Sequence, residues 1–181
     1  LITLRSAWAT PGVVHDVTWG QVRELFHANA ALTYHPHVDG KSKPLDLPLI
    51  CFAAFSGSYK RTDLRSGLSA ICLDYDDTPQ HEFGRVLGLA RKGANRGIAH
   101  TTWKHGTGSI GDVCKRGTVR ARLVLELPDA CALEHWDAVW AAVAGAYYAD
   151  GLDTQCKNPE RCYYLPATNP NAPWPCWIES W

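Results

Sequence analysis

From residue 68 to residue 167 the apolar residues recur with the period of a strand in some segments and of a helix in others. The order of these segments constrains the fold more than any other feature. "LSAICLDYD" alternates with the period of a strand, and "PQHEFGRVLGLARKG" repeats its apolar residues with the period of a helix. Two further strands, a second helix and a short last strand follow, as "RGIAHTTWK", "VRARLVLEL", "LEHWDAVWAAVAGAYY" and "RCYYLPA". The pattern therefore predicts the order strand, helix, strand, strand, helix, strand.

This order is that of the split βαββαβ unit of ferredoxin-like and RNA-recognition-motif folds, so we expect an α+β protein. We assign 67–170 to this core, 1–66 to an N-terminal extension and 171–181 to a tail that packs back on the domain. We expect the first and third core strands to be central and parallel, with the fourth antiparallel beside the first. Residues 1–181 then form one domain, and the absence of Met together with Leu at position 1 predicts that it was excised from a larger protein.

The N-terminal extension contains one helix pattern and one strand pattern. Thr18 is a candidate N-cap for a helix that carries Val22, Leu25 and Phe26 on one face. "LPLICFAAF" (47–55) predicts a buried strand, because loops rich in Gly, Ser and Pro stand on both sides of it.

The composition is that of an ordinary soluble globular protein, with 46% apolar and 20% charged residues. No apolar stretch approaches the roughly 18–20 residues that span a bilayer, and no signal-peptide pattern opens the chain, so we expect a cytoplasmic protein without a membrane partner. The net charge of zero gives no argument for nucleic-acid binding. Seven Cys without a C-x-x-C pair predict reduced structural thiols, and a zinc site from Cys114, Cys156, Cys162 and a His is not expected.

Three carboxylates, those of Asp74, Asp76 and Asp77, end the first core strand. Like charges repel one another, so they form either a solvated turn or a cation site. Strand alternation puts Asp74 and Asp76 on one face, while Asp77 should face away in a polar turn. Asp153, just before the fourth strand, should approach the first two. Because Mg²⁺ and Mn²⁺ prefer carboxylate oxygens, we predict a two-metal site formed by Asp74, Asp76 and Asp153.

Basic side chains should lie near these acids. Arg120 and Arg122 alternate with apolar residues on the third strand, so both should share the open face of the sheet with the carboxylates. In "HTTWKHG", which follows the second strand, His105 and Lys104 can bind phosphate oxygens, whereas His100 is expected to be structural.

Further basic residues cluster in loops and at helix ends, where together they predict a local track for phosphates. They are Lys60, Arg61, Arg65, Arg91, Lys92, Arg96, Lys115 and Arg116. "GTGSIG" (106–111) matches the glycine pattern of dinucleotide sites, but a strand follows it instead of a helix, so we interpret it as a hairpin loop.

Taken together, the motifs resemble the catalytic core of the archaeo-eukaryotic primase superfamily, and more closely the primase-polymerase domains of plasmid and phage replication proteins. That family has a hydrophobic-D-x-D motif, a Ser/Thr-rich strand ending in His, an R-x-R strand, and a third acid followed by Arg. "ICLDYDD", "TTWKH", "VRARLVLELP" and "GLDTQCKNPERCYYLPATN" stand here in that order, over roughly residues 50–170. The spacing of the His motif and Ala167, where relatives carry Gly, depart from the family pattern.

The resemblance implies template-directed nucleotidyl transfer, by which a DNA primase or polymerase makes or extends primers during plasmid or phage replication. It implies that Asp74, Asp76 and Asp153 hold two Mg²⁺ or Mn²⁺ ions, with His105 also catalytic. The implied nucleotide-binding residues are Lys104, His105, Arg120, Arg122 and Arg161, and the nucleic-acid-binding residues are Lys60, Arg61 and Arg65. Partners would be single-stranded DNA template, primer, NTP or dNTP, and a fused or associated helicase.

Two alternatives stay open. "TYHPHVD" (33–39) imitates the metal motif of HUH-type replication-initiator nicking endonucleases, with Tyr147 or Tyr148 as nucleophile, although Pro36 argues against a strand there. A non-enzymatic RNA-recognition-type module would display aromatic residues on the open face for base stacking. Asp and Arg occupy those positions here, which favours an enzyme.

Overall fold

The computed structural model describes residues 1–6, 12–35, 44, 46–55, 63–64, 66–93, 96–105, 117–172 and 175–181. Its elements are β1 (Ile2–Arg5), β2 (Val13–His15), α1 (Trp19–Ala30), β3 (Leu49–Cys51), β4 (Leu68–Pro79), α2 (Gln80–Lys92), β5 (Gly97–Thr101), β6 (Thr118–Cys131), α3 (Leu133–Ala146), the 3-10 helix η2 (Thr154–Lys157), β7 (Tyr163–Tyr164) and β8 (Ile178–Ser180). The expected α+β class is confirmed. No helix among the described residues is long and apolar enough to span a bilayer.

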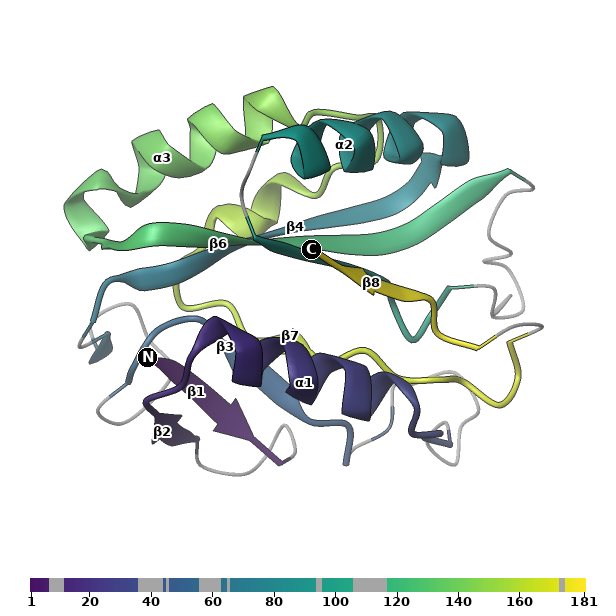
Figure 1. The fold of residues 1–181 in the computed structure, drawn as a ribbon, viewed down its shortest axis with the longest axis horizontal. Helices are drawn as coiled ribbons and strands as arrows, with labels where there is room; N and C mark the ends of the chain where they lie inside the picture. Colours follow the sequence, from purple (N-terminus) through teal and green to yellow (C-terminus); the bar gives the residue numbers. More distant parts are fainter. Residues whose placement is uncertain are drawn as a thin grey trace.

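Two four-stranded antiparallel sheets form two layers (Figure 1). One has the strand order β4-β6-β5-β8, and the other has the order β2-β1-β3-β7. Helices α2 and α3 cover the outer face of the first sheet, and α1 lies in the layer of the second sheet. Tyr75 of β4 faces the helices, because its ring meets Phe83 of α2 edge to face at 5.4 Å and its hydroxyl donates to the Tyr147 carbonyl. The apolar face of β4 is therefore the helix-covered one.

The strand pairing corrects two details of the expected topology. The first and third core strands, β4 and β6, pair antiparallel, with Asp74 opposite Arg122, and are not parallel. β6 lies between β5 and β4 and pairs antiparallel with both of them. The expected fourth strand, β7, pairs with β3 in the second sheet and not with β4. β3 is apolar and fully buried, and its edge supplies the hydrogen-bond partners that β7 needs.

The N-terminal extension forms more structure than its sequence pattern predicts. The start of α1 is as expected: Thr18 accepts a hydrogen bond from the Gln21 backbone, and the Gln21 side chain accepts one from Thr18 N, which is a capping box. However, β1 and β2 join β3 in a sheet that covers part of the face expected to be open. Phe26 of α1 contacts the His100 ring on β5 at 5.6 Å between centroids, which ties the two layers together.

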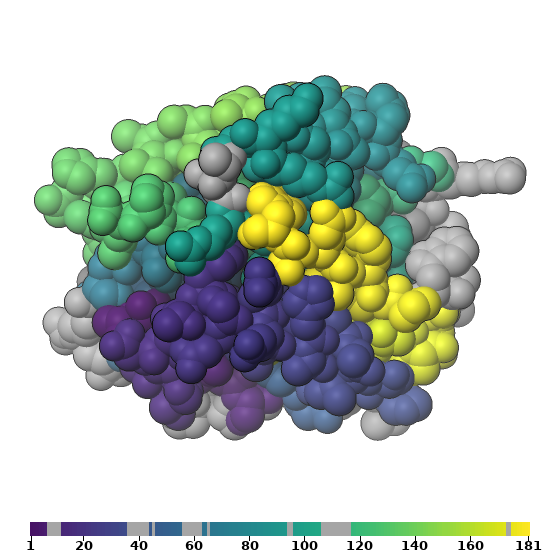
Figure 2. All heavy atoms as spheres, viewed as in Figure 1, coloured from purple at the N-terminus to yellow at the C-terminus, as the bar shows by residue number. Residues whose placement is uncertain are grey.

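The C-terminal tail packs back on the domain as β8, which pairs with β5 at the edge of the first sheet. Figure 2 shows this segment, in yellow, at the surface between α1 and α2. Gly97 is required for the close approach, since a Cβ there would lie 2.4 Å from the Trp181 ring.

Candidate active site

The end of β4 carries Asp74 in regular register, and Asp76 and Asp77 on a β-bulge that follows it. The register with β6 shifts between Tyr75 and Thr78, so Asp76 and Asp77 together stand opposite Arg120. Asp77 has φ 54°, a left-handed conformation that Asp tolerates better than most residues. The bulge lets Arg120 Nε and Nη2 donate to the two carboxylate oxygens of Asp77, at 3.0 and 2.9 Å. The expectation that Asp77 faces away in a turn is therefore wrong, because β4 continues through it.

Asp74 and Arg122 form a buried ion pair one step further along the same strands. Arg122 Nε and Nη2 lie 3.1 and 3.0 Å from Asp74 Oδ2, and Nη1 donates to the Tyr164 carbonyl at 2.8 Å. The Arg122 and Asp74 side chains are only 7% and 8% exposed. Burial alone would lower the pKa of Arg122, but the Asp74 carboxylate raises it, so the guanidinium stays charged. Both Arg residues share a face with the acids, but the second layer closes that face at Asp74.

Asp153 reaches the other acids through backbone contacts along the edge of β4. Asp76 N donates to the Gly151 carbonyl and Asp153 N donates to the Asp74 carbonyl, both at 2.8 Å. The segment before η2 thus occupies the edge position that was expected for the fourth core strand. The Asp153 carboxylate is held by Arg161, whose Nη2 lies 3.0 Å from Oδ2.

Gly151 allows the segment before η2 to lie against the edge of β4, and we expect Gly151→Ala to disrupt this close approach. Its φ is 89°, and an added Cβ would lie 2.3 Å from the Asp76 carbonyl oxygen and 2.6 Å from Thr78 Oγ1. We expect a loss of about 1–3 kcal/mol in the free energy of unfolding, measured with urea. Gly88→Ala on α2 is the control, since nothing lies within 4 Å of its added Cβ and the helix should gain stability. Equal stability of Gly151→Ala and wild type would contradict the close approach.

Asp76 is the exposed member of the acidic group. Its carboxylate makes no ion pair or side-chain hydrogen bond with the described residues. Partial burial by the surrounding protein and then the charge of Asp74 raise its pKa above the usual value, and Asp153 adds to the effect. Arg120 and Arg122 oppose this shift without cancelling it. The negative potential at Asp76 would favour a bound cation.

The donor chemistry of this group fits a hard divalent cation, because all three side chains offer carboxylate oxygens. Among the described residues, however, no three acidic, His or Cys side chains are already arranged to hold a metal ion. Asp74 is turned toward Arg122 and Asp153 toward Arg161. Binding would therefore require these two carboxylates to share their oxygens between Arg and metal, or to turn. The two-metal centre stays a prediction.

His105 lies beyond the end of β5, beside the start of β6. Its backbone N donates to the Thr102 carbonyl at 2.8 Å, and its Nδ1 accepts from Arg120 N at 3.3 Å. The neutral ring therefore carries its proton on Nε2. Burial and then the charge of Arg120 lower the pKa of His105, which favours the neutral ring at pH 7. Lys104, on the same turn, is exposed.

His100 lies in the same cross-strand row as Asp74 and Arg122 but is sealed inside the protein. It is 1% exposed, and Nδ1 donates to the Thr101 carbonyl at 2.9 Å. Burial and then the charge of Arg122 lower the pKa of His100 to about 4, so the ring is neutral. This environment agrees with the structural role expected for it.

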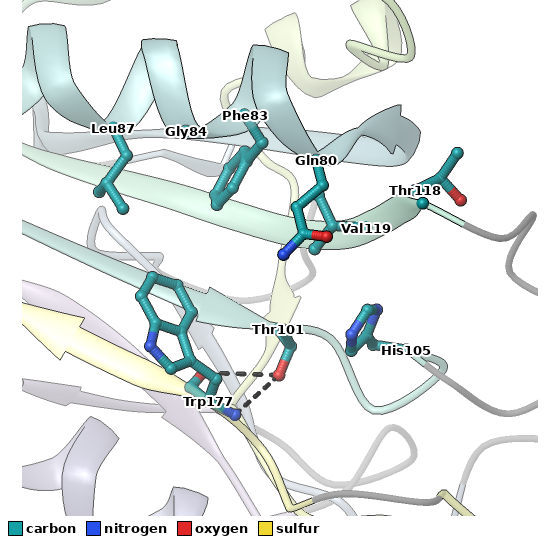
Figure 3. A pocket seen from close by; sticks show the side chains of 10 residues that line it. Gln80, Phe83, Gly84, Leu87, Thr101, His105, Thr118, Val119 and Trp177 are labelled. Atoms are coloured by element: carbon teal, nitrogen blue, oxygen red, sulfur yellow. Dashed lines mark hydrogen bonds between the residues drawn. The ribbon is translucent and has the colours of Figure 1, made fainter.

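A cavity of about 530 Å³ lies on the other side of the first sheet, between α2 and the edge formed by β5 and β8 (Figure 3). Phe83, Leu87 and Trp177 give it apolar walls, and Thr101 holds the Trp177 backbone N at 2.9 Å. His105 lines one end, but none of the three Asp residues predicted to bind metal does. This cavity is thus separate from the acidic group.

Several residues and loops for which the sequence predicts a role lie outside the described residues, so the structure says nothing of them. They are Lys60, Arg61, Arg65, Cys114, Lys115, Arg116, the loop 106–111 and residues 36–39 of the His motif. In the described part of that motif, Thr33 bridges to Thr168 and His35 is exposed, so neither lies on a central strand. A nicking endonuclease would require a central strand at this point.

No protein-family model and no curated protein sequence matches this chain. Among solved structures, the chain is similar to the AEP (archaeo-eukaryotic primase) domain, PP-N190, of the primase-polymerase (PrimPol) of cyanophage S-2L. The TM-score is 0.51 at 12% sequence identity, over 98% of this chain and 80% of that chain. The chain has the archaeo-eukaryotic primase fold. Because the alignment spans nearly the whole chain, the second sheet and the tail belong to the shared fold together with the predicted core.

Proposed function

We propose that this domain is a template-directed nucleotidyltransferase that makes or extends DNA primers. The observation that carries the proposal is the convergence of Asp74, Asp76 and Asp153, from two separate chain segments, beside Arg122 and Arg161. A stability role does not account for this convergence, because the raised pKa of Asp76 means that its ionised form destabilises the fold. The archaeo-eukaryotic primase fold supports the same reaction class.

In this proposal, Asp74, Asp76 and Asp153 hold two Mg²⁺ or Mn²⁺ ions. When bound, such ions activate the attacking 3′-hydroxyl and neutralise the triphosphate and leaving pyrophosphate. Arg122 and Arg161 hold two of the carboxylates in position and keep the buried charge compensated.

The incoming nucleotide is proposed to lie between the acids and the start of β6. Arg120, Arg161 and Lys104 contribute positive charge toward its phosphates. His105 donates from Nε2, because its Nδ1 is engaged by the Arg120 backbone. Arg122 acts on the triphosphate at longer range, since it is buried against Asp74.

The partners follow from the same chemistry. The solved domain of similar fold comes from a protein named a primase-polymerase. For this chain we propose a single-stranded DNA template, a primer strand and NTP or dNTP as substrates, with Lys60, Arg61 and Arg65 contacting nucleic acid. A role in plasmid or phage replication beside a helicase completes the proposal.

The test is primer synthesis on single-stranded DNA with labelled nucleotides and Mg²⁺ or Mn²⁺. We expect metal-dependent products whose yield falls by about 10³-fold or more in Asp74→Ala/Asp76→Ala, because the ligands of both ions are lost. Asp129→Ala, which removes an exposed carboxylate from the far part of β6, should retain wild-type yield.

Extension of a supplied primer is measured in parallel, since a domain can polymerise without initiating. Folded wild-type protein that makes no product in either assay with either metal would overturn the proposal. A covalent DNA adduct on Tyr147 or Tyr148 would instead support the nicking reaction.

A further inference from the structure

Cys51 and Cys162 lie next to each other where β3 meets β7. β3 and β7 pair antiparallel, with Ile50 opposite Tyr163. Extending this register by one residue sets Cys162 directly opposite Cys51. Both strands belong to the second sheet, in which they are neighbours (Figure 1).

The hydrogen-bond pattern places this Cys pair at a close position of the ladder. Leu165 N donates to the Pro48 carbonyl at 2.8 Å, which marks that pair as a hydrogen-bonded one. Hydrogen-bonded and non-hydrogen-bonded pairs alternate, so Cys51 and Cys162 form a non-hydrogen-bonded pair. The Cα atoms of such pairs are about 4.5 Å apart, which is within the roughly 4.4–6.8 Å range of disulfides.

The two thiols differ in environment, and Arg5 of β1 accounts for part of the difference. The Cys51 thiol donates a hydrogen bond to the Pro159 carbonyl at 3.9 Å. The neighbouring Cys51 side chain lowers the pKa of Cys162; burial opposes this shift, and the charge of Arg5 adds to it. The neighbouring Cys162 side chain and then burial raise the pKa of Cys51. Cys51 is 1% exposed, whereas Cys162 is only partly buried. This asymmetry suits one attacking thiolate and one buried resolving thiol.

The other Cys residues in the described part of the chain do not share this environment. Cys72 and Cys156 lie near each other, but burial raises the pKa of both. Burial also raises the pKa of Cys131 and Cys176. Cys162 is thus the Cys among the described residues whose pKa is lowered.

We propose that Cys51 and Cys162 form a redox-active dithiol that low-molecular-weight disulfides oxidise to an intramolecular disulfide. The Cys162 thiolate attacks one sulfur of the external disulfide, forming a mixed disulfide and expelling one thiolate, which takes up the proton that Cys162 lost on ionising. Cys51 then attacks the Cys162 sulfur and loses its proton to the second external thiol as that thiol leaves. Two protein thiols are oxidised, and one external disulfide is reduced to two thiols.

The Cys51–Cys162 disulfide would lie beside Arg161, at the edge of the candidate active site. Cys162 stands between Arg161, which holds Asp153, and Tyr163, whose ring faces the Arg161 and Arg122 guanidinium groups at 5.8 and 5.5 Å. A disulfide would fix the start of β7 to β3. It would also close a long chain loop in the unfolded state, so we expect oxidation to raise Tm by roughly 10 °C.

The test incubates the folded chain in buffers of reduced and oxidised glutathione, blocks free thiols with N-ethylmaleimide and maps peptides by mass spectrometry. We expect a linked Cys51–Cys162 peptide in wild type. Cys51→Ser should stop at the glutathione adduct on Cys162, and Cys162→Ser should give neither product. Cys131→Ser, which removes another partly buried thiol, should behave as wild type. These readouts do not depend on nucleotidyl transfer.

A measurement on the wild type alone covers the case in which a variant does not fold. With limiting N-ethylmaleimide, the folded protein should be modified at Cys162 at least about tenfold faster than at Cys131, because the thiolate is the reactive species. Absence of the linked peptide, or equal reactivity of the two thiols, would overturn the proposal. A Tm shift on oxidation that persists in Cys162→Ser would do the same.

Discussion

Asp76→Asn is expected to abolish nucleotidyl transfer and, in metal-free buffer at neutral pH, to make the fold more stable. The change removes a proposed metal ligand, so we expect activity to fall by about 10³-fold or more. It also removes a charge that burial and the carboxylates of Asp74 and Asp153 destabilise, as the raised pKa of Asp76 shows. Loss of activity with gain of stability is typical of a residue kept for function.

The pH dependence of this gain follows from the direction of the pKa shift. Below the usual Asp pKa of about 3.9, Asp76 is protonated in both the folded and the unfolded chain, so wild type and variant should be equally stable. As the pH rises from the usual to the raised pKa, the wild type loses stability relative to the variant, and the difference is complete above the raised pKa.

Urea unfolding with EDTA, near pH 4 and at pH 7, measures this difference alongside the primer assay. Asp129→Asn is the control for removal of one exposed carboxylate. If Asp76→Asn keeps its activity, Asp76 is not a metal ligand. If Asp76→Asn is less stable than wild type at pH 7, the electrostatic explanation of the raised pKa is contradicted.

Arg122→Ala is expected to cause the largest loss of stability, about 3–5 kcal/mol. The change leaves the Asp74 carboxylate buried without its partner and takes a donor from the Tyr164 carbonyl. Replacing both members, as in Asp74→Leu/Arg122→Met, should recover most of the loss, because no buried charge remains. Urea unfolding of wild type, Asp74→Leu, Arg122→Met and the double variant forms a double-mutant cycle that isolates the interaction.

Arg96→Ala is the control for an exposed ion pair. Arg96 lies 3.3 Å from Glu126 with 67% of its side chain exposed, so its loss should cost less than about 1 kcal/mol. Equal losses in the free energy of unfolding for Arg96→Ala and Arg122→Ala would contradict the prediction. They would show that removing the partner of the buried Asp74 costs no more than breaking an exposed ion pair.

The long core elements could be predicted because each carries a full apolar face. β4, α2, β6 and α3 have 12, 13, 14 and 14 residues, long enough for strand or helix periodicity to be unambiguous. The same alternation correctly put Asp74 and Arg122 on one face of the sheet, across from Tyr75. The short strands β1, β2 and β8, which the sequence pattern did not predict, have three or four residues, too few for a period to appear.

The bulge shows in the burial pattern of β4 and not in its sequence. Tyr75 and Thr78 are three residues apart, and both are buried. A regular strand would place them on opposite faces, so an extra residue must intervene. An apolar and a hydroxyl side chain at this spacing do not by themselves mark both positions as buried, and the pairing of Asp77 with Arg120 therefore did not follow from alternation.

The sequence by itself determined the order and type of the core elements, and which face carries the acids and Arg residues, because local periodicity encodes burial. Only the tertiary structure decided which strand β7 joins, how the segment at Gly151 lies along β4, and which Arg holds each Asp. These depend on edges and ion pairs between segments far apart in the chain, where no local period reports the partner. The buried Asp74–Arg122 pair exists because a second sheet, built from short strands, excludes water from it.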